Sequence, residues 1–101
     1  MTPEVLSIYD GKINNYRIET GVLGIRTGNF ASEEYLDENG AEMRRATAGL
    51  WLILRGRPET SSFQRVYGGQ EIEYQGRRIR VLAVGSDHRG MYVKMEVENT
   101  K

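Results

Sequence analysis

Apolar residues recur at every second position through most of this chain, and that spacing places them on one side of a β-strand. In residues 90–98, GMYVKMEVE, the apolar positions are Met91, Val93, Met95 and Val97. The two preceding segments share this period, and Gln75-Gly76 between them suits a hairpin turn because glycine tolerates positive φ. Residues 68–98 therefore predict a three-stranded antiparallel meander.

Alternation also assigns side chains to faces. In residues 77–84, one face is expected to hold Ile79, Val81 and Ala83, and the other Arg78, Arg80, Leu82 and Val84. Residues 49–56, GLWLILRG, are apolar on both faces, which is typical of a strand covered on both sides. The centre of the core is predicted to consist of Leu50, Leu52, Ile79, Val81, Val93 and Met95.

Residues 31–46 are compatible with two structures. A hairpin with Asn39-Gly40 as a type I′ turn is favoured, because Asn-Gly is the strongest two-residue hairpin signal. The alternative is a short helix capped by Ser32 and ended at Asn39.

Upstream segments show the same alternation, with turns expected at Asp10-Gly11 and Thr20-Gly21. A length of 101 residues predicts one domain spanning 1–101. We expect an all-β fold, a small antiparallel β-sandwich or barrel of about 7–9 short strands with at most one short helix. The absence of cysteine excludes disulfides, zinc-thiolate sites and cysteine nucleophiles. The chain start has no signal-peptide pattern, and no apolar run is long enough for a membrane span. A cytoplasmic location and no membrane partner are therefore expected.

Charge is unevenly distributed although the formal net charge is zero. Residues 1–43 hold three basic and eight acidic side chains, whereas residues 44–101 hold eleven basic and six acidic ones. Arginine outnumbers lysine 11 to 3, and its planar fork of donors suits structured ion pairs and interfaces. Internal pairing between the two halves is the favoured interpretation.

Local motifs give no support for catalysis. Ser86, Asp87 and His88 are the residue types of a hydrolase triad, but three consecutive residues cannot readily adopt its geometry, so a turn is expected with His88 exposed. The acidic residues 37–42 lack the glycine and glutamate positions of a calcium loop. Glycines show no phosphate-loop spacing. The chain is therefore predicted to be no enzyme and to have no cofactor, metal or catalytic residue.

Arginines interleaved with tyrosines provide the candidate interaction surface. Its predicted members are Arg44, Arg45, Arg65, Tyr67, Tyr74, Arg78, Arg80 and Tyr92. The leading hypothesis is a small non-enzymatic protein-binding β module, such as an inhibitor, an immunity or counter-defence factor, or an assembly subunit, whose partner is another protein or a second copy. The alternatives are a module that binds RNA or single-stranded DNA through an arginine- and tyrosine-rich surface and a small-ligand-binding barrel.

We expect two copies of this chain to associate, because a net charge of zero removes overall repulsion and the oppositely charged halves can attract each other. At micromolar concentration, we expect a mass above that of one chain in low salt and a shift toward monomer in high salt. Analytical ultracentrifugation in both buffers measures this. A strict monomer in both would leave only a foreign partner.

Overall fold

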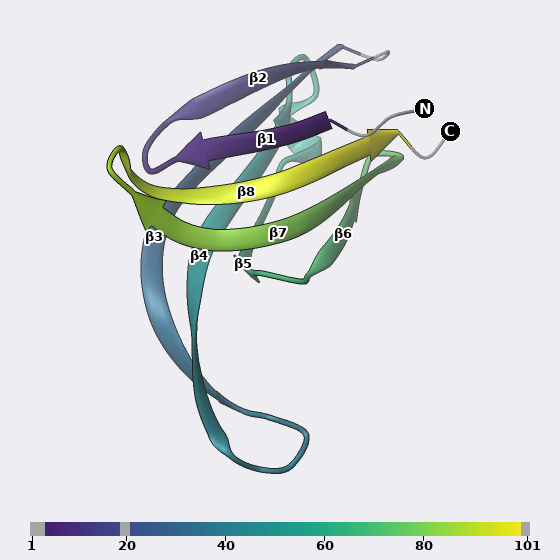
Figure 1. Cartoon of the computed structure of the whole chain (residues 1–101). Helices are drawn as coiled ribbons and strands as arrows, with labels where there is room; N and C mark the ends of the chain where they lie inside the picture. Colours follow the sequence, from purple (N-terminus) through teal and green to yellow (C-terminus); the bar gives the residue numbers. More distant parts are fainter. Residues whose placement is uncertain (1–3, 19–20, 100–101) are drawn as a thin grey trace.

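The computed structural model describes residues 4–18 and 21–99 and is built almost entirely of β-strands. Eight strands form two four-stranded antiparallel sheets that pack as a sandwich rather than a closed barrel (Figure 1). The predicted fold class is therefore confirmed. None of the described segments is a helix of the length and apolarity that crossing a membrane requires.

The first sheet has the spatial order β1-β8-β7-β6. Its strands are β1 (Glu4–Tyr9), β6 (Glu71–Tyr74), β7 (Arg77–Asp87) and β8 (Gly90–Asn99). The last three form the predicted meander. The turn between β6 and β7 has positive φ at both Gln75 (49°) and Gly76 (79°), as a type I′ turn requires.

The second sheet has the order β2-β3-β4-β5. Its strands are β2 (Ile13–Ile18), β3 (Gly21–Leu36), β4 (Glu42–Leu54) and β5 (Ser62–Tyr67). A one-turn 3-10 helix at Pro58–Thr60 precedes β5. The predicted turn at Asp10-Gly11 is confirmed and carries the chain from the first sheet to the second, whereas the turn predicted at Thr20-Gly21 lies partly outside the described residues.

The core lies between the two sheets. All six residues predicted for its centre are at most 1% exposed, which confirms the strand faces in those segments. The polar side chain of Thr27 is fully buried there, and its hydroxyl lies 3.2 Å from the carbonyl of Ile8 and 3.3 Å from that of Tyr9. Because a buried hydroxyl needs a partner, these contacts tie β3 to β1 across the sandwich.

A β-bulge changes the predicted faces of β7. Partners shift between Val81, which pairs with Met95, and Ala83, which pairs with Lys94. An extra residue in one strand reverses the alternation beyond it. Val84 therefore packs against the core, and the prediction that it shares the face of Arg78 and Arg80 is wrong.

Residues 31–46 form a hairpin, and the helical alternative is wrong. The hairpin is the outer part of β3 and β4, and it projects from the sandwich as a two-stranded arm (Figure 1). The predicted type I′ turn is also wrong, because the loop spans residues 37–41 and only Gly40 within it has positive φ. The Asp37 carboxylate closes this loop by accepting the backbone N–H groups of Asn39 and Ala41, each at 2.9 Å.

Truncating the core should destabilise the whole domain. We expect Leu52→Ala and Val93→Ala each to lower the free energy of unfolding by about 2–5 kcal/mol, because each leaves a cavity in a packed interior. Urea unfolding followed by circular dichroism measures the change. Unchanged midpoints for both variants would contradict this packing.

Candidate functional site

The outer face of the second sheet exposes large apolar side chains. Since Leu50, Leu52 and Leu54 point into the core, the intervening Trp51 and Ile53 of β4 must point outward. Register then places further side chains beside them, namely Ile13, Arg26 and Phe63. Exposed fractions of 58% for Ile13, 37% for Ile53 and 52% for Phe63 show that no described part of the chain covers this face. The expectation that the strand is covered on both sides is wrong.

We call this outer face of the second sheet the platform, and Trp51 lies near its middle. The Trp51 and Phe63 rings lie 4.6 Å apart between centroids, and the Arg26 guanidinium lies 5.5 Å from the Trp51 ring. Gly28 and Gly49 form the floor beneath these rings. A Cβ at Gly49 would lie only 2.9 Å from Phe63 Cε1 and 3.2 Å from Trp51 Cη2, so glycine allows the rings to lie flat.

The platform continues onto the base of the arm. There the Arg65 Nε donates to Glu33 Oε2 at 3.0 Å and to Thr47 Oγ1 at 3.1 Å. Another guanidinium nitrogen of Arg65 donates to the backbone carbonyl of Asn29. Arg65 therefore crosses from β5 to the bulge of β3 and fastens the arm to the sandwich.

Arginine and tyrosine stack one step further along the arm. The guanidinium carbon of Arg45 lies 4.2 Å from the Tyr35 ring centroid and 3.6 Å from that of Tyr67. Such cation–π contacts hold the guanidinium in place. This cluster shares the outer face with Arg65, because residues 43, 45 and 47 alternate with the inner-facing ones.

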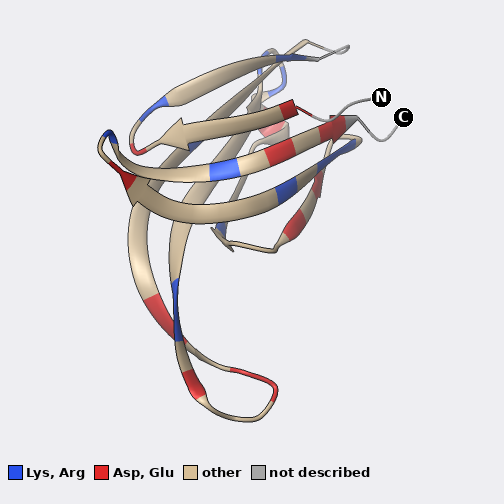
Figure 2. Cartoon of the chain, in the orientation of Figure 1, with Lys and Arg blue, Asp and Glu red and all other residues tan. Residues whose placement is uncertain are grey.

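The platform and its extension carry excess positive charge. Among their described residues are five arginines, Arg17, Arg26, Arg45, Arg55 and Arg65. The acids are two, Glu33 and Asp10, and the Asp10 carboxylate lies beside Gly28 at the platform floor. Acidic residues gather instead around the tip of the arm (Figure 2). The surface is thus both apolar and basic.

The outer face of the first sheet is different, because its charges pair with each other. Arg80 lies 3.4 Å from both Glu71 and Glu96, and Arg78 Nε lies 3.3 Å from Glu71. Figure 2 shows these opposite charges side by side on β7 and β8. Arg78 and Arg80 thus have acidic partners within the chain.

The eight predicted surface residues do not form one site. Arg45, Arg65 and Tyr67 come together beside the platform. Arg44 lies on the other face of the arm, where it pairs with Glu34 at 3.0 Å. The others belong to the first sheet: Arg78 and Arg80 are ion-paired, Tyr74 is buried, and Tyr92 packs against Tyr9 with centroids 5.7 Å apart.

The predictions missed the platform residues Trp51, Ile53, Phe63 and Arg26. The available signal was the run of apolar residues on both faces of residues 49–56. A strand at the surface of a two-layer sandwich has one face outward, so such a run also indicates an uncovered interface.

The segment Ser86-Asp87-His88 leads into the β7–β8 turn. The two Asp87 carboxylate oxygens accept the Tyr9 hydroxyl and the Arg89 backbone N–H, each at 2.7 Å, and His88 is exposed. The prediction that His88 is exposed in a turn is confirmed, but Ser86 and Asp87 belong to β7, and the turn consists of His88 and Arg89. Within residues 4–18 and 21–99, no group of three or more acidic or histidine side chains is arranged to hold a metal ion.

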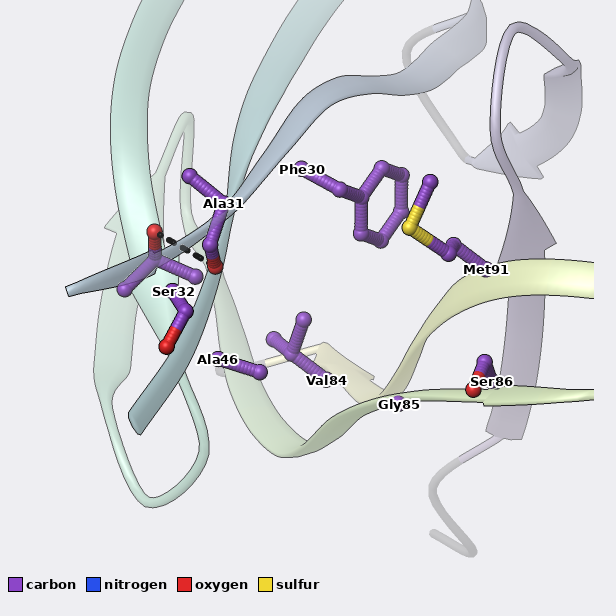
Figure 3. Close-up of a pocket in the computed structure, with 9 residues that line it drawn as sticks. Phe30, Ala31, Ser32, Ala46, Val84, Gly85, Ser86 and Met91 are labelled. Carbon is purple, nitrogen blue, oxygen red and sulfur yellow. Dashed lines mark hydrogen bonds between the residues drawn. The ribbon is translucent and has the colours of Figure 1, made fainter. Parts of the chain in front are cut away.

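A hollow of about 330 Å³ opens where the arm leaves the sandwich (Figure 3). Phe30 and Ala46 from the arm base face Val84 and Met91 from the first sheet across it. None of its lining residues is an arginine, so the hollow offers no guanidinium to an anionic ligand.

Comparisons with known proteins do not assign this chain to a family. No protein-family model matches the chain, and comparisons with curated proteins and with solved structures gave no match. Functional argument therefore depends on the surfaces described above.

The Tyr9–Asp87 hydrogen bond should make stability depend on pH at both extremes. It lowers the pKa of Asp87 below its ordinary 3.8 and raises the pKa of Tyr9 above its ordinary 10.0. Its stabilisation is therefore complete at neutral pH, and is lost as pH falls through the folded pKa of Asp87 or rises through that of Tyr9. We expect Tyr9→Phe to lower the unfolding midpoint at neutral pH, with a smaller difference at about pH 2. An equal difference at both pH values would contradict this coupling.

Proposed function

We propose that this chain is a small non-enzymatic protein-binding module whose platform is its contact surface. The uncovered apolar face around Trp51, Ile53 and Phe63 carries this proposal. Contiguous apolar surface rimmed by polar groups is a mark of interaction sites in soluble proteins. The partner is another protein or a second copy of this chain.

The residue types on the platform favour a protein partner. Tryptophan, phenylalanine, tyrosine, methionine and arginine are enriched at protein–protein interfaces, whereas lysine, glutamate and aspartate are depleted. Across its described positions, the platform and arm base hold such residues without a lysine and with two acids, Glu33 and Asp10. The aliphatic Ile13 and Ile53 suit an apolar protein surface better than a phosphate backbone.

Single-stranded nucleic acid is the second candidate. The stack of Arg45 with Tyr35 and Tyr67 favours it, because arginines and aromatic rings hold bases and phosphates on β surfaces. However, Arg45 already occupies one face of each ring, and a base needs a free face on which to stack. Nucleic acid is therefore ranked below protein.

Photo-crosslinking from matched positions tests the proposal. Ile53 on the platform and Leu82 at the bulge of β7 are 37% and 39% exposed, so a benzophenone side chain at either position has similar access to solvent. In cells that express each variant, we expect a discrete protein adduct from position 53 and none from position 82. Adding Phe63→Ser to the position 53 variant should abolish the adduct.

Mass spectrometry identifies the adduct as a second copy or a foreign protein, and either identity supports the proposal. Equal labelling from both positions, no adduct from position 53, or an adduct with nucleic acid would contradict it.

A further inference from the structure

Arg45 is held in a fixed position but has no acidic partner. Its guanidinium lies between the Tyr35 and Tyr67 rings, at 4.2 and 3.6 Å from their centroids. Stacking on ring faces leaves the N–H groups at the edge of the guanidinium directed away from the rings. A planar fork of donors is thus oriented before any ligand arrives.

The carboxylate nearest in register is already bound elsewhere. Glu33 lies directly opposite Arg45 in the β3–β4 ladder, but its Oε2 accepts from Arg65 at 3.0 Å. Across the part of the chain that the structure describes, no ion pair or hydrogen bond reaches the Arg45 guanidinium, and its Nε is buried without an acceptor. The two terminal guanidinium nitrogens are not among the buried unpartnered atoms, so they are the donors that a ligand can reach.

A free strand edge runs beside this arginine. Pairing between β4 and β5 ends at Thr47 with Tyr67, so β4 from Glu42 to Ala46 pairs only with β3 among the described strands. This stretch contains no proline and no register shift, two of the devices that protect an edge. A third device, charged side chains, is present as Glu42, Arg44 and Arg45, so an added strand must match these charges. The outward-directed backbone amides and carbonyls of this stretch are therefore available to an added strand. Figure 1 shows that this part of β4 lies in the projecting arm.

We propose that Arg45 anchors a carboxylate of an extended segment that the protein partner adds to this free edge of β4. The proposal rests on the proposed protein-binding function and specifies its partner. A carboxylate matches the arginine fork, which can bind it through two parallel hydrogen bonds. Five arginines against two acids, Glu33 and Asp10, leave this face with excess positive charge that attracts an acidic segment.

Strand geometry also predicts the pattern of the partner segment. Met43 and Arg45 lie on the same face of the arm, and Met43 is 44% exposed. Residues two apart in an added strand point to one face. The segment therefore carries an acidic residue facing Arg45 and an apolar residue two positions away facing Met43.

Nuclear magnetic resonance of the arginine Nε–H groups tests this site in the full chain. The probe is a capped peptide with threonine at alternate positions and valine, glutamate and valine between them, and its control has glutamine in place of glutamate. We expect a saturable shift of the Arg45 resonance, with binding at least about tenfold weaker for the glutamine peptide because the charge-assisted pair is lost.

Two matched lysine variants distinguish the effect of the planar guanidinium of Arg45 from that of positive charge alone. Arg45→Lys and Arg44→Lys both keep the positive charge, but Arg44 lies on the other face of the arm and pairs with Glu34. Arg45→Lys should weaken the glutamate peptide at least about tenfold, and Arg44→Lys by less than about twofold. The peptide comparison on the unmodified chain gives the answer even if Arg45→Lys fails to fold.

Four results would overturn the anchor. They are equal binding of both peptides, equal losses in both lysine variants, no saturable shift at peptide concentrations up to about 10 mM, or tighter binding of a thymidine oligonucleotide at Arg45. A position 53 crosslink to protein together with any of these would leave the platform as an interface and remove only the anchor. Peptide binding without that crosslink would instead contradict the platform.

Discussion

Strand β4 can bury only alternate side chains, yet it carries large apolar residues at consecutive positions. Leu50, Leu52 and Leu54 fill the core between the sheets, so Trp51 and Ile53 must lie at the surface. The two layers leave no third layer to cover them. Apolar area left in water forgoes about 25 cal/mol per Å² of stabilisation, and a partner covering the platform would recover it.

Local sequence patterns predicted those parts of the fold that depend only on residues close together in the chain. The type I′ turn at Gln75-Gly76 and the six central core residues followed from two-residue periodicity and glycine conformation. The bulge between Val81 and Ala83 did not follow, because an inserted residue leaves no mark in an apolar run. The loop that Asp37 closes was also missed, since its carboxylate competes with the Asn39-Gly40 signal.

The candidate site depended on contacts between distant segments, and the sequence alone could not supply them. Arg65 reaches Glu33, which lies 32 residues away, and thereby leaves Arg45 without its opposite acid. Arg78 and Arg80 were correctly expected to share a face, but sheet pairing surrounds them with Glu71 and Glu96. Which arginines remain unpaired is thus decided by register, a property of the assembled sheets.

The strand pairing between β3 and β4 is less stable in the arm that carries Arg45 than inside the sandwich. An isolated two-stranded hairpin is only marginally stable in water, whereas the same strands inside the sandwich are held by two neighbours and a core. Fraying therefore begins at the loop around Asp37 and proceeds inward while the domain stays folded. It meets resistance where Arg65 links β5 to Glu33 and Asn29. Arg65 therefore limits how far the arm can open. Amide protons should exchange with solvent quickly in the arm between Arg65 and the loop, and slowly in the part of the ladder inside the sandwich.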